Sequence, residues 1–307
     1  MNLSRIVTGV VLAIGLTAAG QMGGATRIVA QQWRVTELAF QAQRDHADPF
    51  DDPSVDFRAE FTGPHGTRIT IPGFWDGERT WRVRFTPTLP GQWRFRTLCS
   101  TDAGLDGRSG VLTAAPAAGH ALRKHGGFLA VSDDARYLTH PDGTPFFWLA
   151  DTWWTCPSAQ LPLADFRLLV DKRLEQGYSV FQAHGFRAFE PDGANAFEAV
   201  QKPSGGALAY WRRTDAYYAY AERVGLLGII GFYGGWSLGT YPYQNHERLW
   251  RYFLARYGAY PITFLITQEY NVVTPSTKGK GYDRQYTQLG RYIRKHDPYR
   301  RAMSIHP

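Results

Sequence analysis

The chain has 307 residues, enough for one large or two ordinary domains. Aromatic residues make up 15% of it, which suits a well-filled core and, beyond that, flat surfaces that stack on ring-shaped ligands. The net charge of +7 comes mainly from arginines scattered along the chain, without a long run of like charges. This composition argues against a nucleic-acid-binding protein and is typical of a mildly basic exported protein.

Residues 1–30 have the features of a signal peptide. A short positive segment ends at Arg5, and the apolar segment 6–19 that follows is too short for a comfortable membrane span. We expect cleavage after Ala19, Gly20 or Ala30, and an uncleaved anchor is the alternative. In either case the sequence predicts a secreted or periplasmic protein with no membrane contact beyond this segment.

Residues 31–118 alternate between apolar and polar side chains in one short segment after another. Phe57, Ala59 and Phe61, for example, are separated by Arg58 and Glu60. This period of two is typical of antiparallel strands with one face on a core and the other in water. Turn residues separate the segments at Gly63–Gly66, Asp76–Gly77, Pro90–Gly91 and Asp106–Gly107. We therefore predict an antiparallel, Ig-like β-sandwich, and no residue in it has a catalytic pattern.

Four arginines, Arg82, Arg84, Arg94 and Arg96, fall on the polar side of two of these segments. We expect them on a solvated sheet face, because charge on an exposed face needs no partner. A stripe that binds an acidic polysaccharide is the alternative.

The chain has two cysteines, Cys99 and Cys156. They fall in different predicted domains, and their spacing matches neither a disulfide framework nor a zinc site. We therefore expect both to be buried or free and not bridged to each other.

Residues 119–307 change to a rhythm of strand, helix, strand, helix. The predicted strands are Phe146–Ala150, Tyr178–Ala183, Leu226–Phe232, Ile262–Thr267 and Ala302–Ile305. Apolar residues at helical spacing lie between them, with Thr214 as the expected N-cap of one helix. Strands that alternate with helices predict a parallel sheet with right-handed crossovers.

Each predicted strand ends in polar or aromatic residues, and the carboxyl ends of parallel strands lie at the same rim. Glu269 is the candidate catalytic carboxylate, because it directly follows a buried apolar strand. The candidate substrate-binding residues at this rim are Asp151, Trp153, Trp154, His184, Tyr233, Trp236, Gln268, Tyr270 and Asn271. Aromatic faces stack on sugar rings, while carboxylates and amides bind sugar hydroxyls. The rim therefore favours an oligo- or polysaccharide ligand.

Three segments of the chain resemble the apiosidase-like barrels of the glycoside hydrolases, which are related to glycoside hydrolase family 140. They are residues 145–154 (PFFWLADTWW), 173–182 (RLEQGYSVFQ) and 262–271 (ITFLITQEYN). Pro49–Phe50, Gly73–Gly77 and Trp81–Pro87 resemble the β-sandwich that commonly precedes such barrels. The resemblance implies a retaining glycosidase with an acid/base at the end of the fourth strand, where Glu269 stands, and a nucleophile near the end of the seventh.

Two departures from this pattern are visible. Family members usually carry two glycines before the acid, and this chain has Thr267 and Gln268. A (β/α)₈ barrel needs roughly 250 residues, and residues 145–307 supply 163. We therefore expect an incomplete (β/α)₈ barrel that stops after its fifth strand, lacks the nucleophile, and is able to self-associate through its open edge.

The residues predict no cofactor, since neither a metal-ligand spacing nor a phosphate-binding glycine loop is present. His184 and His306 are lone histidines and do not form such a spacing. The alternative to an enzyme is a non-catalytic carbohydrate-binding or interaction protein, which would use the same tryptophans without a carboxylate pair.

Overall fold

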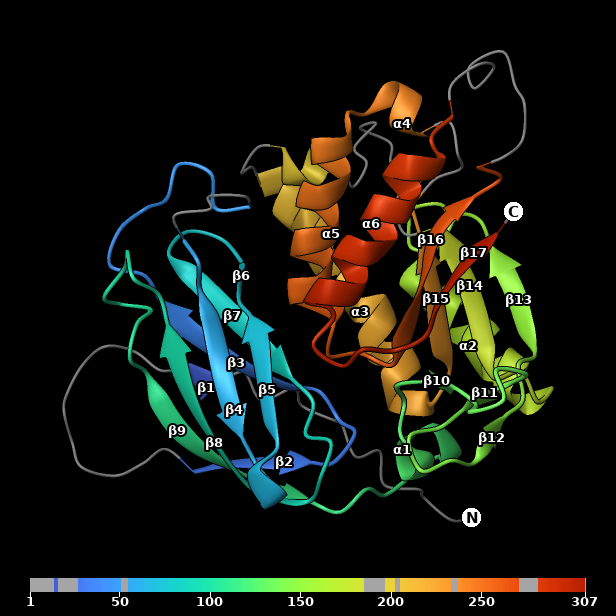
Figure 1. Cartoon of the computed structure of the whole chain (residues 1–307), viewed down its shortest axis with the longest axis horizontal. Helices are drawn as coiled ribbons and strands as arrows, with labels where there is room; N and C mark the ends of the chain where they lie inside the picture. The colour runs from blue at the N-terminus through green and yellow to red at the C-terminus, as the bar shows by residue number, and fades with distance from the viewer. Residues whose placement is uncertain are drawn as a thin grey trace.

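The computed structural model describes residues 14–15, 27–50, 55–184, 197–201, 205–232, 237–270 and 281–306. A β-rich domain comes first in the chain, and an α/β domain built on a parallel sheet follows it (Figure 1). Helices of the second domain lie between its sheet and the β-rich domain, so the two domains share an extensive contact (Figure 1).

The β-rich domain consists of two sheets, in the strand orders β1-β3-β7-β6 and β2-β9-β8-β4-β5. Its elements are β1 (Ile14–Gly15), β2 (Arg27–Gln31), β3 (Thr36–Gln41), β4 (Arg58–Thr62), η1 (Pro64–Gly66), β5 (Arg68–Pro72), β6 (Phe74–Trp75), β7 (Thr80–Phe85), β8 (Gly91–Leu98) and β9 (Ser109–Ala115). In β8, buried Trp93, Phe95 and Thr97 alternate with exposed Arg94 and Arg96, which confirms the period of two. The buried side chains of both sheets belong to one core.

The prediction of a purely antiparallel domain is wrong at one edge of each sheet. Strand β2 pairs in parallel with β9, from Arg27 opposite Val111 to Gln31 opposite Ala115. Strand β1 also pairs in parallel, with β3. The sheet of β2 and β9 thus includes residues 27–30, which the sequence places within the predicted signal peptide. Cleavage after Ala30 would remove most of β2, whereas cleavage after Ala19 or Gly20 would leave it intact.

The α/β domain contains a five-stranded parallel sheet in which sequential strands are neighbours, in the order β13-β14-β15-β16-β17. Its elements are α1 (Ala121–His125), β10 (Ala130–Val131), β11 (Leu138–Thr139), β12 (Pro145–Phe146), β13 (Ala150–Trp153), α2 (Leu163–Glu175), β14 (Val180–His184), η2 (Glu198–Val200), α3 (Gly205–Val224), β15 (Leu227–Gly231), α4 (Ser237–Thr240), α5 (Tyr243–Tyr257), β16 (Ile262–Gln268), α6 (Asp283–His296) and β17 (Met303–His306). The predicted alternation of strands and helices is confirmed.

Two predicted boundaries in this domain are wrong. The first parallel strand begins at Ala150, whereas Pro145 and Phe146 form β12 in a small antiparallel sheet with β11. Thr214 is not an N-cap, because α3 already begins at Gly205. The hydroxyl of Thr214 instead donates to the carbonyl of Tyr210 one turn earlier, at 3.0 Å, as mid-helix threonines often do.

The parallel sheet has two different faces. Its outer face packs against α2, α3, α5 and α6, through residues such as Phe181, Ile230 and Phe264. Its inner face carries Val180, Leu227, Ile229 and Leu265, which form a second cluster with Leu122 of α1 and with Leu129. Residues two apart in a strand share a face, so each strand supplies side chains to both.

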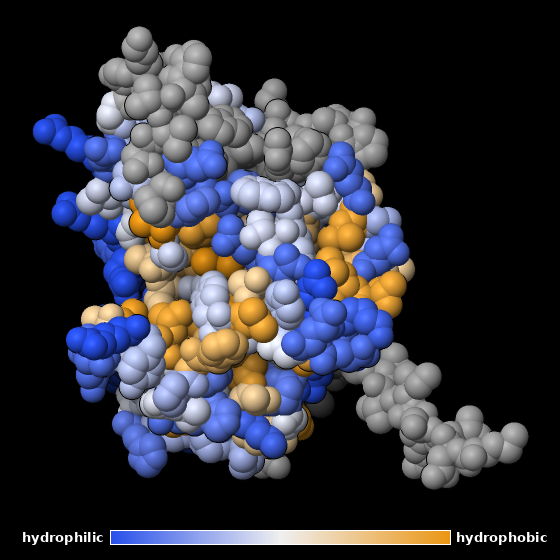
Figure 2. Space-filling view, turned by 90° about the vertical axis from the view of Figure 1, so that its right-hand side faces the viewer, coloured by the Kyte–Doolittle hydropathy of each residue, from blue (hydrophilic) through white to orange (hydrophobic). Residues whose placement is uncertain are grey.

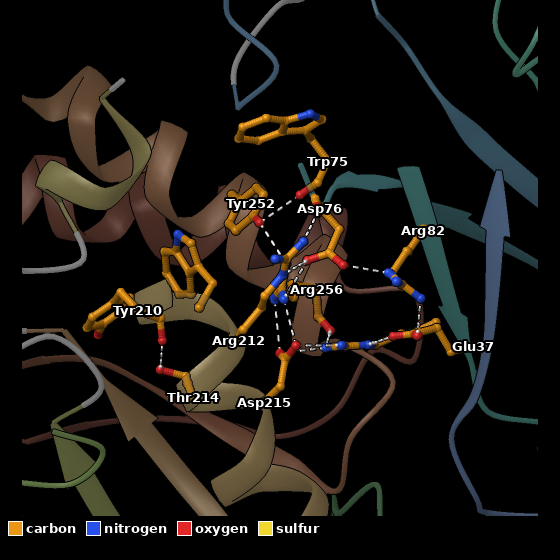
Figure 3. A network of polar contacts seen from close by, with 12 residues as sticks. Glu37, Trp75, Asp76, Arg82, Tyr210, Arg212, Thr214, Asp215, Tyr252 and Arg256 are labelled. Atoms are coloured by element: carbon orange, nitrogen blue, oxygen red, sulfur yellow. Dashed lines mark hydrogen bonds and ion pairs between the residues drawn. The ribbon is translucent and has the colours of Figure 1, made fainter. Parts of the chain in front are cut away.

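Buried ion pairs join the two domains. Arg84 of the β-rich domain pairs with Asp215, and Arg256 of the α/β domain pairs with Asp76, the second pair being visible in Figure 3. Both Nη atoms of Arg84 in β7 donate to the carboxylate of Asp215 in α3, each at 2.9 Å. Arg256 in α5, whose side chain is fully buried, donates to Asp215 at 2.6 Å and to Asp76 at 3.0 Å. Burial alone would raise the pKa of Asp215, but the charges of Arg256 and Arg84 outweigh it and hold that pKa well below its usual range.

This network corrects the expectation of four solvated arginines. Arg84 is 5% exposed, and it binds Glu37 in addition to Asp215. Arg82 binds Glu37 and Asp76, each at 2.6 Å. Because β7 faces α5 of the other domain, its polar side is an interface and not a solvated surface. Only the expectation for Arg94 and Arg96 of β8 is confirmed.

Cys99 and Cys156 are both buried and free, as expected. Among the described residues no helix has the length and apolar character that crossing a membrane requires. The described residues also contain no cluster of three or more histidine, cysteine, aspartate or glutamate side chains able to hold a metal ion.

Candidate active site at the carboxyl ends of the parallel strands

The parallel register brings the ends of the strands to one side of the α/β domain. Trp153 pairs with Ala183, His184 with Gly231, and Gly231 with Leu265. Beyond this level, β16 continues to Gln268, which pairs with His306 of β17. The predicted convergence of strand ends is therefore present in the sheet.

Glu269 is exposed and follows β16 directly, at the predicted position. Its φ is 49°, in the left-handed region that residues other than glycine seldom adopt. Its backbone N–H donates to the carbonyl of His306 at 2.9 Å, which ties the end of β16 to β17. A left-handed glutamate costs on the order of 1 kcal/mol or more, and residues held in this way gather at active sites.

A β-bulge precedes Glu269. Leu265 pairs with Ser304, but Gln268 pairs with His306, so β16 uses one residue more than β17 over this stretch. Such a bulge bends the strand and redirects the side chains that follow it. With this register, Gln268 lies on the same inner face of the sheet as Leu265. The local geometry thus re-aims the strand end that carries the candidate acid.

Gln268 is 3% exposed, and within the described part of the chain no acceptor meets its side-chain Nε2. A buried amide without a partner is uncommon and costs about 1–3 kcal/mol. This residue stands where the family resemblance leads one to expect glycine. Its unpaired donor beside Glu269 is therefore available to an acceptor oxygen of a ligand.

Trp154 and His184 form an aromatic pair at the ends of β13 and β14. Their ring centroids are 4.5 Å apart with an interplanar angle of 60°. Trp154 is 44% exposed, whereas His184 is buried. His184 shares the face of Val180 by alternation, so the pair lies on the inner face. The side of the α/β domain that carries β13 shows several apolar patches among hydrophilic residues (Figure 2).

Asp151 and Trp153 do not belong to this group, contrary to expectation. Both lie inside β13 and face the helices instead of following the strand's end. The ring of Trp153 stacks on Phe181 with centroids 4.9 Å apart. The Asp151 carboxylate accepts a hydrogen bond from Arg173 of α2 at 2.7 Å. Burial by itself would raise the pKa of Asp151, but the hydrogen bond and the charge of Arg173 help to bring it below its usual value. The shift of β13 toward the carboxyl end explains both corrections.

Tyr270 is half-buried and lies toward α6. It lines a cavity of about 280 Å³ together with Ile266, Ile305 and Tyr286. The structure thus places it on the outer side of β16, away from the Trp154 pair. Three further predicted residues, Tyr233, Trp236 and Asn271, lie outside the described residues.

Comparison with known proteins agrees with this architecture. A profile described as the apiosidase-like catalytic domain matches residues 132–307, more than half of the chain. The chain belongs to the apiosidase-like family. A domain of unknown function (DUF5060) matches residues 29–100 of the β-rich domain. A search of curated proteins gives no match.

One solved structure shares the fold of this apiosidase-like chain. A protein assigned as a glycoside hydrolase from Bacteroides vulgatus has a TM-score of 0.69 at 20% identity. The match covers 91% of this chain and 56% of that protein, so the chain spans about half of its relative. A glycoside hydrolase family 5 protein from the same organism gives a TM-score of 0.49 at 22% identity, over 59% of this chain and 40% of its own.

The sequence patterns did not reveal two features near the strands' ends. The bulge in β16 appears only when its register with β17 is known. The unpaired amide of Gln268 likewise depends on what surrounds it. The one sequence signal for both was the replacement of the family's glycines by Thr267 and Gln268.

Proposed function

We propose that this apiosidase-like chain carries the general acid/base of a retaining glycoside hydrolase, and that Glu269 is this residue. The observation that carries the proposal is the conformation of Glu269, a left-handed residue directly after a bulged parallel strand in the family's catalytic domain. A backbone held against its own preference positions a carboxyl group more firmly than a freely rotating loop would.

In the proposed reaction, the Glu269 carboxyl protonates the leaving glycosidic oxygen while a second carboxylate attacks the anomeric carbon. The Glu269 carboxylate then takes a proton from the water that releases the sugar. The second carboxylate must lie about 5–5.5 Å from the first. Asp151 is unsuited to this role because Arg173 holds it on the α2 side. We propose that the nucleophile comes from a later strand of the barrel.

The proposed substrates are side chains of plant-type or other complex polysaccharides. The protein would act on them outside the cytoplasm, after the N-terminal segment has directed its export. Trp154 offers an exposed ring for a sugar face, and Gln268 offers an unpaired donor for a sugar oxygen. His184 supports Trp154 through its ring contact. These contacts would orient the glycosidic bond toward Glu269.

For the architecture, we propose that β13–β17 form the first five strands of a (β/α)₈ barrel and that the β-rich domain is an Ig-like sandwich. The parallel order of the strands and the helices on one face support the first part. Partial exposure of the inner face at Trp154 supports self-association of the chain through this side.

A non-catalytic carbohydrate-binding protein is the second candidate. The exposed ring of Trp154 favours it, since stacking needs no carboxylate. The two candidates differ in their dependence on Glu269: an enzyme loses turnover without it, whereas a binding protein keeps its affinity.

The test is hydrolysis of a panel of plant cell-wall glycans by the chain and, where its reading frame continues, by the longer product. Glu269→Gln should lower kcat/KM on these glycans by about 10²–10⁴-fold, the usual contribution of acid/base catalysis. With aryl glycosides that have acidic leaving groups, this variant should slow the first step much less, because such leaving groups depart with little protonation. Asp151→Asn, the matched carboxylate variant, should retain turnover.

Equal losses on both substrate types would argue against an acid role for Glu269. Glycan binding without any cleavage by either form would favour the binding protein.

A further inference from the structure

A second cavity lies where the two domains meet, and the proposed hydrolysis does not use it. It has a volume of about 300 Å³, and its walls include Trp33 and Thr88 of the β-rich domain and Phe128, Tyr299 and Arg300 of the α/β domain. Residues 299–301 come just before β17, whereas Glu269 follows the carboxyl end of β16. The cavity therefore lies at the opposite end of the parallel sheet from the candidate active site.

Aromatic rings form one side of this cavity. Trp33 meets Phe128 edge to face, with centroids 5.7 Å apart, and Phe128 stacks on Tyr299 at 4.2 Å. The Tyr299 hydroxyl is already satisfied by the backbone of Thr86. Trp33 is half-buried, and within the described part of the chain its indole N–H has no acceptor. The wall thus offers apolar ring surface together with one available donor.

The backbone is strained at two of the lining residues. Trp33 has a φ of 61° and Arg300 a φ of 51°, both in the left-handed region. For a residue as bulky as tryptophan this conformation is a clear outlier. A Cβ on Gly126 would lie 3.0 Å from the Trp33 ring, so glycine there leaves room for the indole. Strain of this kind persists where the surrounding structure requires a particular placement.

The cavity carries an unbalanced positive charge. Arg301 is buried and paired with Asp297 at 2.8 Å, so its charge is neutralised. Arg300 is exposed, and its guanidinium has no ion-pair partner among the described residues. No carboxylate belongs to the described lining of the cavity. Its charge is therefore complementary to an anion.

We propose that this cavity is a binding site for an acidic sugar residue, a uronate, within a polysaccharide chain. The cavity is at the lower limit of ligand-pocket size, which suits a single ring. One face of the ring would lie on the Trp33 wall, and the carboxylate would accept hydrogen bonds from the Arg300 guanidinium, which pairs with carboxylates in two-point geometry. The site would bind the polysaccharide at a place remote from the catalytic rim.

The experiment measures binding of a sodium oligogalacturonide by calorimetry, on the full chain with Glu269→Gln present so that turnover cannot interfere. The control ligand is the same oligomer with its carboxylates reduced to alcohols. Arg300→Asn is the test variant, because asparagine tolerates the left-handed backbone and folding is preserved. Arg96→Asn, on an exposed strand of the β-rich domain, is the matched control.

We expect the acidic oligomer to bind, the reduced oligomer to bind at least about tenfold more weakly, and Arg300→Asn to cost at least the same factor, as for loss of a charged hydrogen bond. Arg96→Asn should change nothing, and Trp33→Ala should weaken both ligands. Equal affinities for the two ligands, an effect of Arg96→Asn as large as that of Arg300→Asn, or no binding at all would overturn the proposal. Because Glu269 is already replaced, these outcomes are independent of the proposed hydrolysis.

Discussion

Replacing Asp215 by asparagine should loosen the contact between the two domains. Asp215 is the carboxylate that Arg84 and Arg256 share, and both guanidinium groups are nearly or fully buried. Asparagine keeps the size of the side chain but removes its charge. Arg84 then retains Glu37 and Arg256 retains Asp76, so two buried cations are left with less than their full compensation.

The size of the effect follows from this burial. Removing one partner of a buried ion pair costs about 3–5 kcal/mol, and the 20% exposure of Asp215 places this pair near the lower end. We therefore expect a loss of about 3 kcal/mol in the free energy of unfolding. At roughly 2 °C per kcal/mol for a chain of this size, the melting temperature should fall by about 6 °C.

The effect should also depend on pH. The native pKa of Asp215 lies below its usual value, so its contribution is complete above the unfolded pKa of about 3.9 and is lost as the pH falls through the native value. The difference between the wild-type protein and Asp215→Asn should therefore be constant above about pH 5 and shrink in stronger acid.

Differential scanning calorimetry measures both quantities. Asp45→Asn is the control, because Asp45 accepts two hydrogen bonds from Arg79, at 2.9 and 3.2 Å, in an equally bidentate but exposed pair. We expect no measurable shift for this variant. If Asp215→Asn lowers the melting temperature no more than Asp45→Asn, the buried network does not stabilise the domain contact.

Three further outcomes are expected. Burial lowers the pKa of His246 to about 4. The free energy of unfolding should therefore decline by about 3 kcal/mol as the pH falls from about 6.5 to 4, because only the unfolded chain takes up this proton in that range. In urea titrations, His246→Gln should flatten this dependence on pH. Burial raises the pKa of the Cys156 thiol, so a thiol reagent should leave Cys156 unmodified in the native protein and label it only in urea. Rapid labelling of Cys156 in the native state of a Cys99→Ser variant would contradict this. Gln268→Met should weaken glycan binding by roughly tenfold, while stability stays the same or rises because an unpaired buried amide is removed. A loss of stability with unchanged affinity would show that the amide has a structural role.

The sequence by itself determined the type of the main strands and helices, although it placed most of β2 in the signal peptide. A period of two in β8 and mainly apolar runs in β15 and β16 are local patterns, and each matches the faces that the strand buries. The position of Glu269 followed from the same reasoning, because the polar residues after a buried strand mark its end. The weak points were boundaries. Residues 145–150 (PFFWLA) form one continuous apolar and aromatic run, and only the pairing of Ala150 with Val180 shows where the parallel strand begins.

The tertiary structure decided what each polar side chain does. Arg84 and Arg94 have the same alternating sequence context, yet the first is buried against Asp215 and the second is exposed. The sequence predicts a rim carboxylate at Asp151, but its side chain accepts a hydrogen bond from Arg173, 22 residues later. Partners of this kind come from distant parts of the chain, so their contact depends on how sheets and helices pack. Local sequence patterns record which face a residue occupies, but not what lies opposite that face.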